Sequence, residues 1–236
     1  GTPTPFALTL HATDADTSDT LTWSIASPAG HGIATVSGTG LSKAVAYTPA
    51  ANYNGVDSFV VQVSDGNGGV ASIIVNVSIA SVNDAPAGTD KTVTMLEDTP
   101  YTFSVADFGF TDPLDNPANG LAAVKITTVP GTGTLKNGVT TLTGGETVTV
   151  ADINGNKLVY TPDANANGST SFTFQVQDDG TGANIDLSAN TLTINVTPVN
   201  DAPVITEGVS TAVGMSEDGT PTPFALTLHA TDADTS

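Results

Sequence analysis

Acidic residues in short clusters are the side chains of this sequence best suited to chemistry. Of the 24 acidic residues, 20 are Asp and four are Glu. They gather in Thr13-Asp14-Ala15-Asp16 and beside Asn in two Asn-Asp pairs, at 83–84 and 200–201. Carboxylate and amide oxygens are the ligands that hard cations prefer, and the same residues also build tight turns. The clusters therefore indicate either cation sites or turns.

The charge balance limits the classes of partner. Five Lys and no Arg stand against the acids, and the net charge is −19. Nucleic-acid binding needs clustered basic residues, so we expect none. The self-repulsion of such a chain destabilises a compact state unless cations offset it. No apolar run of about 18 residues occurs, so membrane insertion is not expected either.

Enzymatic motifs are missing from the sequence. The three histidines, His11, His31 and His229, form no His-x-x-x-His pair, and neither Cys nor a nucleophile elbow occurs. A carboxylate pair of the glycosidase type stays open at this stage, but it normally needs a deep cleft. Domains of about 100 residues rarely provide one, and we predict that the chain is not an enzyme.

Two internal repeats set the domain frame. Residues 1–18 recur unchanged as residues 219–236, which predicts near-identical units with a period of 218 residues. Asn-Asp-Ala-Pro at 83–86 recurs at 200–203, so each unit holds two diverged domains. We predict a first domain at 1–84 that lacks its opening strand, a complete domain at 85–202, and the first two strands of the next repeat at 203–236.

Short segments rich in β-branched and aromatic residues predict strands throughout, with no helical periodicity. The pattern favours an all-β chain of tandem Greek-key β-sandwiches with Trp23 and Tyr47 in the core. Residues 65–69 predict a hairpin loop. The segments are Phe6–Leu10, Leu21–Ile25, Phe59–Val63, Ile73–Val77, Tyr101–Val105, Val124–Thr128, Lys157–Tyr160, Ser171–Val176 and Thr191–Val196.

Four motifs together carry a family resemblance. They are the interdomain Asn-Asp-Ala-Pro, Tyr-Thr-Pro at 47–49 followed by the segment 52–59, Val-Ser-Asp-Gly at 63–66, and Thr-Asp-Ala-Asp at 13–16. Over nearly its whole length the chain resembles the bacterial cadherin-like tandem repeats of giant exported adhesins of the RTX type. The resemblance implies an immunoglobulin/cadherin-like fold, a secreted location on the bacterial cell surface, Ca²⁺ at the joints between domains, and neighbouring repeats as partners.

The resemblance also implies ligands for the joint between the first two domains. They come from the linker and from the downstream domain, and the upstream Glu of the pattern has its copy in Glu217. The spacing departs from the pattern, because two Asp in the downstream loop lie three residues apart instead of two. The implied ligands are Asn83, Asp84, Asp112 and Asp178, with Asp115 or Asp179 as further candidates.

A second joint follows the second domain. The resemblance implies Glu97 and Asp98 upstream, the linker Asn200 and Asp201, and the downstream pair Asp232 and Asp234. In the first domain, the matching residues Asp14, Asp16 and Asp65 face an upstream neighbour. For Asp65 and Asp178, which lie in Asp-Gly loops, a purely turn-forming role stays open.

The remaining acids have plainer interpretations. Asp57, together with Asn52 and Asn54, predicts a turn, with contact to a metal ion as the alternative. A second set is expected on the solvated surface: Asp107, Asp152, Asp163 and Asp186.

These observations lead to a main functional expectation and one alternative. The main one is a calcium-stiffened spacer in a surface adhesin that supports cell adhesion or biofilm formation. The alternative is that the repeats bind glycan or each other directly, which needs exposed Trp or Tyr rings for sugar stacking. The segment 204–218 also matches the strand that the first domain lacks, so we expect it to be donated to another copy.

Overall fold

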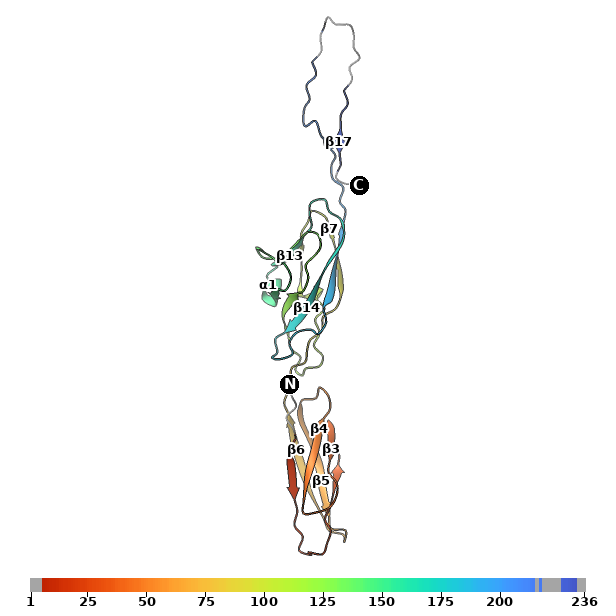
Figure 1. Ribbon diagram of the computed structural model, residues 1–236, viewed down its shortest axis with the longest axis vertical. Coiled ribbons are helices and arrows are strands. Elements are labelled where there is room, and N and C mark those ends of the chain that lie inside the picture. Colours follow the sequence, from red (N-terminus) through yellow and green to blue (C-terminus); the bar gives the residue numbers. More distant parts are fainter. Residues whose placement is uncertain (1–5, 215–216, 218–225, 233–236) are drawn as a thin grey trace. The chain divides into compact units, whose positions relative to one another are not determined.

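The structure is a computed structural model that describes residues 6–214, 217 and 226–232. Nearly all regular structure is β-strand, which confirms the all-β class (Figure 1). The chain divides into two compact units. Unit 1 takes in Gly1–Pro86, Asp112–Gly120 and Asp178–Ile185, and unit 2 takes in Ala87–Thr111, Leu121–Gln177 and Asp186–Ser236. Within the described ranges, no helix has the length and apolar character needed to cross a membrane.

Unit 1 consists of two three-stranded sheets. One has the order β1-β4-β3 and the other β2-β5-β6, with every neighbouring pair antiparallel. A hydrogen bond of 3.2 Å from the Asp65 amide to the Gly69 carbonyl closes the loop between β5 and β6, as predicted. The strands are Leu8–His11 (β1), Thr22–Ser27 (β2), Gly32–Thr35 (β3), Ser42–Pro49 (β4), Gly55–Ser64 (β5) and Val70–Ile79 (β6).

Alternating side chains of both sheets form the core of unit 1. Trp23 and Tyr47 are both buried, as the sequence predicts, and Tyr47 stacks on Phe59 with ring centroids 5.8 Å apart. The indole N–H of the buried Trp23 is satisfied, because it donates a hydrogen bond to the Gly40 carbonyl at 2.8 Å. The core also holds Leu21, Val45, Val61, Val63 and Val75.

Unit 2 repeats this plan with additional strands. Its first sheet has the order β11-β10-β13-β8 and its second β12-β9-β14-β15-β7, in which β7 pairs parallel to β15. The strands are Lys91–Leu96 (β7), Tyr101–Thr102 (β8), Leu121–Ile126 (β9), Thr134–Asn137 (β10), Thr140–Thr141 (β11), Thr147–Thr149 (β12), Leu158–Thr161 (β13), Gly168–Asp178 (β14) and Asn190–Thr197 (β15).

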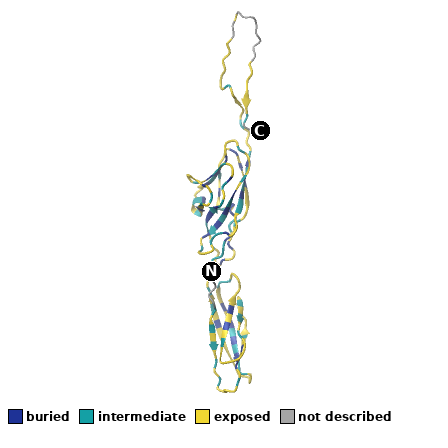
Figure 2. Ribbon diagram, viewed as in Figure 1, coloured by how far each residue is buried: buried dark blue, intermediate teal, exposed yellow. Residues whose placement is uncertain are grey.

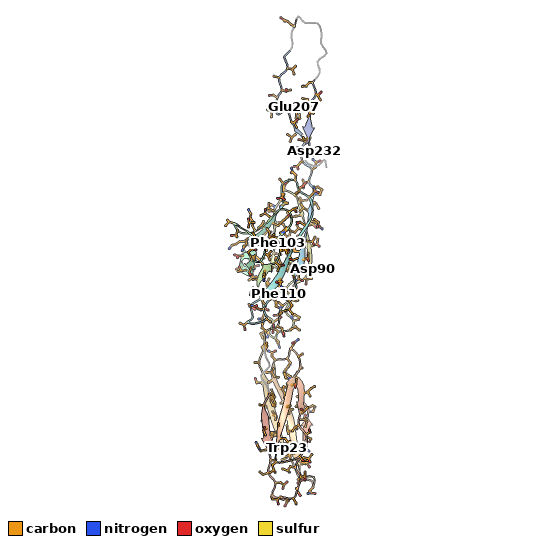
Figure 3. All side chains as sticks on the ribbon, in the orientation of Figure 1. Trp23, Asp90, Phe103, Phe110, Glu207 and Asp232 are labelled. Atoms are coloured by element: carbon orange, nitrogen blue, oxygen red, sulfur yellow. The ribbon has the colours of Figure 1, made fainter. Side chains whose placement is uncertain are left out.

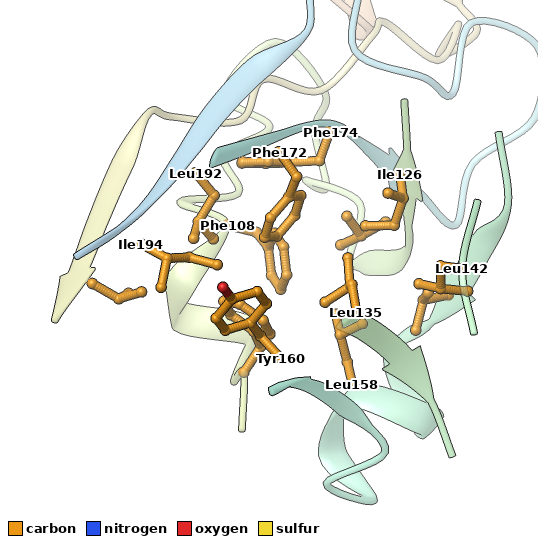
Figure 4. Close-up of a cluster of buried hydrophobic side chains, with 14 of the residues drawn as sticks. Phe108, Ile126, Leu135, Leu142, Leu158, Tyr160, Phe172, Phe174, Leu192 and Ile194 are labelled. Atoms are coloured by element: carbon orange, nitrogen blue, oxygen red, sulfur yellow. The ribbon is translucent and has the colours of Figure 1, made fainter. Parts of the chain in front are cut away.

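The core of unit 2 is larger and more aromatic. Phe172 and Phe174 project from β14 against Phe103 and Phe108, in edge-to-face pairs with centroids 5.4 and 5.0 Å apart. Figure 4 shows the rings of Phe108, Phe172 and Phe174 among the aliphatic residues of the core. Figure 2 shows the buried residues concentrated in the middle of each unit.

Two short helical turns depart from the all-strand prediction. Val150–Asn154 is a five-residue α-helix (α1), capped by the Thr149 hydroxyl, which accepts from the Asp152 amide. The predicted strand 101–105 is shorter than expected, because a 3₁₀ turn (η1) begins at Val105 and ends at Asp107. Both turns are too short for hydrophobic periodicity to reveal them.

The C-terminal part of the chain starts the same pattern again. Val204–Ile205 (β16) pairs antiparallel with Ala230–Thr231 (β17). Ala87 and Thr111, at the matching places of the repeat, form an equivalent antiparallel bridge. The predicted segment 204–218 lies partly outside the described residues.

Candidate metal centre

Three loops of unit 1 bring most of the predicted ligands of the first joint together. Asn83 and Asp84 follow the first sandwich, the loop 112–120 precedes β9, and Asp178 ends β14. The carboxylates in the two loops are buried, with Asp178 1%, Asp112 7% and Asp115 8% exposed. A buried carboxylate is costly unless hydrogen bonds or a cation compensate it, so the partners of each oxygen decide what this group can do.

The linker residues bind directly to these carboxylates. The Asn83 amide group donates to Asp178 at 3.3 Å and to the Ala183 carbonyl at 2.9 Å. The Asp84 backbone N–H donates to both oxygens of Asp115, at 3.2 and 3.1 Å. The structure therefore brings Asn83, Asp84, Asp115 and Asp178 into one group.

Asp112 is the exception within this group. Its Oδ2 accepts the Asn119 backbone N–H at 3.0 Å, but among the hydrogen bonds of the described residues its buried Oδ1 accepts none. Burial raises the pKa of Asp112, and the negative charges of Asp115 and Asp178 raise it further. The negative charge of an ionised Asp112 carboxylate is therefore poorly compensated by its surroundings.

Two residues of this group escaped the sequence analysis. The Asn119 amide donates to Asn83 Oδ1 at 2.7 Å and so connects the linker to the Asp112 loop. Gly180 lies so close to Asn83 that a Cβ there would overlap the Asn83 Oδ1 atom. A single Asn or Gly within a polar loop carries no signal of its own, because only the approach of distant loops gives it a role.

A second group lies within unit 2. Glu97, at the end of β7, is only 2% exposed, and its Oε1 accepts the Val199 backbone N–H at 2.8 Å. The linker Asn200 donates to the Asp201 carbonyl at 2.8 Å, as Asn83 does to Asp84 at 2.9 Å. The two Asn-Asp linkers thus adopt the same local geometry.

Asp201 and Asp232 line a common hollow with Asn165 and Val204. Asp232 directly follows β17 (Figure 3), in the same way that Asp112 follows the Ala87–Thr111 bridge. Asp98, which follows Glu97 in the sequence, accepts the Asn165 backbone N–H at 3.1 Å. Asp234 lies outside the described residues, and Glu217 is exposed.

The acids of the first domain differ in their contacts. Asp14 and Asp16 form a cluster with Asp19, in which one carboxylate oxygen from each residue lies within 4.8 Å of the others. Sequence reasoning missed Asp19, although its spacing of three residues from Asp16 was visible. Asp65 instead accepts the amides of Asn67 and Gly69 at 2.7 and 2.9 Å, which is the geometry of a turn.

Three acids expected in turns or on the surface are buried instead, so those expectations were wrong. Asp107 accepts the amide and hydroxyl of Ser104, and Asp186 accepts the Gly88 and Ser188 amides. Asp57 is 9% exposed and lies on β5, not in a turn. These hydrogen bonds, and for Asp107 also Lys91 Nζ at 4.0 Å, explain why the carboxylates are tolerated inside.

Asp57 holds a loop of unit 1 in place. Burial acts to raise its pKa, but the Tyr47 hydroxyl and the amides of His31, Gly30 and Ser58 outweigh this and lower the pKa to about 2. The Tyr47 hydroxyl donates at 2.8 Å, and burial together with this bond raises the pKa of Tyr47 to about 12. This carboxylate is saturated with donors, so its role is structural.

The aromatic rings offer little flat surface for a sugar. Trp23, Tyr47 and Tyr160 are buried, and Tyr53 stacks on the His31 ring with centroids 4.0 Å apart.

Near the C-terminal end of the described residues, His229 Nδ1 lies 2.9 Å from a carboxylate oxygen of Glu207, a pair that the sequence did not reveal.

Comparisons with known proteins agree with this architecture. The family model of the bacterial Ig domain matches residues 1–78 and 83–197, so the chain belongs to that family. No curated protein matches the chain.

Solved structures show the same fold at low identity. The protocadherin gammaB7 EC3-6 cis-dimer structure is 16% identical to this chain, with a TM-score of 0.58. The match covers 100% of this chain and 56% of the protocadherin chain. Human CDH23 EC21-23 is 18% identical, with a TM-score of 0.57, and the match covers 99% of this chain and 76% of the CDH23 chain. This chain therefore spans little more than half of that protocadherin, and the likeness confirms an immunoglobulin/cadherin-like repeat fold.

Proposed function

We propose that this member of the bacterial Ig domain family is a run of spacer repeats, stiffened by calcium, in a large exported adhesin of the RTX type. In this role the repeats hold an adhesive module away from the bacterial surface and support adhesion or biofilm formation. They act by position and rigidity, and they carry out no catalysis.

The buried Asp112 carboxylate is the observation that supports this proposal most. Within the described part of the chain, one of its oxygens has no hydrogen-bond donor, while Asp115 and Asp178 add negative charge around it. Carboxylate and carbonyl oxygens are the donor set that Ca²⁺ takes, six to eight at a time. The residues present therefore fit a calcium ion better than an empty acidic group.

Each residue of the group has a distinct part in this proposal. Asp112, Asp115 and Asp178 supply carboxylate oxygens, and the Asn83-Asp84 linker supplies further oxygens. Bound calcium supplies positive charge that offsets their mutual repulsion. Because the linker amides already bind these carboxylates, the ion ties the linker to the ends of two loops.

The second group extends the same proposal. Glu97, Asn200, Asp201 and Asp232 are proposed ligands there, since Asp201 and Asp232 line one hollow and Glu97 binds the start of the linker. Asp14 and Asp16, with Asp19, are proposed ligands at the opposite end of the first domain. Asp234, Glu217 and Asp65 stay predictions from the resemblance.

The test compares the chain with calcium and with a chelator. Small-angle X-ray scattering measures the spread of domain orientations, calorimetric titration counts the ions, and thermal unfolding measures the gain in stability. We expect calcium to narrow the range of shapes and to raise the melting temperature. Asp163→Asn is the matched control for each acidic variant, because Asp163 is exposed and lies outside these groups. Identical scattering and melting with and without calcium would overturn the proposal.

A further inference from the structure

Asp179 differs from the other acids of the first group in its exposure and its contacts. It is exposed, whereas three carboxylates of the group are buried: Asp112, Asp115 and Asp178. Its Oδ1 accepts the Gly120 backbone N–H at 2.8 Å, and its own backbone N–H donates to the Gly120 carbonyl at 3.0 Å. These two bonds join two loops of unit 1, residues 112–120 and 178–185. Asp179 therefore holds both backbone groups of Gly120.

Gly120 follows the residue on which two members of the group depend. The Asn119 backbone N–H donates to Asp112 Oδ2 at 3.0 Å, and its side-chain amide donates to Asn83 Oδ1 at 2.7 Å. Glycine has the greatest backbone freedom of all residues, so the chain after Asn119 needs hydrogen bonds from another loop to hold one conformation. By fixing Gly120, Asp179 also fixes the orientation of Asp112 and Asn83.

The repeat shows that Asp179 is an added residue. Gln-Val-Ser-Asp-Gly at 62–66 aligns with Gln-Val-Gln-Asp-Asp-Gly at 175–180, and Asp179 has no counterpart in the first of these segments. The facing loop differs as well, because its two acids, at 112 and 115, lie three residues apart instead of two. The wider loop and the added acid thus occur together and contact each other.

We propose that Asp179 is a positioning residue of the calcium site and not one of its ligands. Its carboxylate holds the peptide unit between Asn119 and Gly120, which keeps Asp112 Oδ2 on the Asn119 amide. The buried Oδ1 of Asp112, which no donor among the described residues reaches, is then left for the ion. Residues outside the ligand set commonly orient the ligands of a metal in this way. The inference rests on the proposed calcium role and names the residue that sets the geometry of its site.

Two substitutions at this position separate positioning from direct binding. The hydrogen bond to Gly120 needs only an oxygen acceptor, whereas an anionic ligand acts through its negative charge. Asp179→Asn removes the charge and keeps an oxygen, while Asp179→Ala removes both. A positioning role therefore predicts that only Asp179→Ala is harmful, and a ligand role predicts that both variants are.

The first experiment is calcium titration calorimetry of the full chain at physiological salt. We expect Asp179→Ala to bind calcium about 10–100-fold more weakly than the parent, and Asp179→Asn to stay close to the parent. Asp163→Ala is the matched control, because the exposed Asp163 accepts the Gly133 backbone N–H at 3.0 Å within unit 2. It loses the same kind of bond and the same charge outside the group, and its calcium affinity should not change. Parent-like affinity of Asp179→Ala, or equal losses in both Asp179 variants, overturns the proposal.

The second experiment measures hydrogen exchange of the Gly120 amide by NMR in chelator. We expect exchange to be about tenfold faster in Asp179→Ala than in the parent, the order expected for losing a hydrogen bond to a charged group. Asp179→Asn should change it less, and the Gly133 amide should exchange alike in all three proteins. This measurement needs no calcium, so it separates the two claims. A parent that takes up no calcium contradicts the proposed function, whereas unchanged Gly120 exchange in Asp179→Ala contradicts the positioning role.

Discussion

Replacing Asp112 by Asn should raise the stability of unit 1 in the absence of calcium and reduce the stability that calcium adds. Asn keeps the shape of the side chain and an oxygen for the Asn119 amide, but it removes the negative charge beside Asp115 and Asp178. In chelator we expect the variant to melt higher than the parent, because one of three buried like charges has gone. In calcium we expect it to gain less than the parent, because the ion loses an anionic ligand.

The calcium arm has a size that follows from linkage. Calcium at about ten times its dissociation constant stabilises the parent by about 1.4 kcal/mol per site. For a domain of this length, that corresponds to a rise of about 6–11 °C in melting temperature. If the variant binds about tenfold more weakly, the gain at the same calcium concentration falls to about 0.4 kcal/mol, or about 2–3 °C.

Trp23 fluorescence is the assay, because Trp23 is the chain's one tryptophan and is 4% exposed in the core of unit 1. A pH series in chelator adds an independent check. The folded pKa of Asp112 is raised, so its contribution favours folding at low pH and is lost as the pH rises through that pKa. Asp112→Asn should remove this loss. A variant that melts lower in chelator, with an unchanged calcium gain, would refute the reasoning.

Three further substitutions test other parts of the structure. Gly180→Ala should weaken calcium binding in titration calorimetry, because the added Cβ displaces Asn83, and unchanged affinity would contradict that placement. Asp57→Asn should lower the melting temperature of unit 1 at neutral pH. The variant should also lose less stability as the pH falls from about 4 towards 2. In the parent, the pKa of Asp57 is lower in the folded than in the unfolded state, so the carboxylate stabilises the fold above the unfolded pKa and stops doing so as it is protonated. If Asp57→Asn and the parent show the same acid transition in the Trp23 signal, the prediction is wrong. Phe172→Ala should cost about 3–5 kcal/mol in urea unfolding followed by circular dichroism, since its ring is fully buried, and a cost below about 1 kcal/mol would argue against this core.

The positions of most strands were predictable because their signal is local. Alternating side chains gave β5, β6, β14 and β15, and the Asp-Gly loop gave the hairpin at residues 65–69. The ends of the strands were less predictable, since η1 replaces the last part of a predicted strand. A turn that short is decided by the Asp107 cap and by packing, which hydrophobic periodicity does not register.

The candidate metal centre was predictable only in part. The Asn-Asp linkers and the acids of the nearby loops could be named from repeats and resemblance, because those patterns recur along the chain. The sequence did not show that Asn119 connects Asn83 to the Asp112 loop, or that Gly180 must lack a Cβ beside Asn83. Both depend on loops about 36 and 97 residues apart from the linker coming together.

The acids show where the boundary between sequence and tertiary structure lies. The sequence by itself determined the all-β class, the internal repeats of residues and the excess of Asp, because composition and periodicity are properties of the chain. Only the tertiary structure decided that Asp57 and Asp186 are saturated with donors, and that among the described residues no donor reaches the buried Oδ1 of Asp112. The physical reason is that the sequence pattern around an Asp is similar in every polar loop, whereas the free energy of its carboxylate depends on the donors and charges that folding places around it.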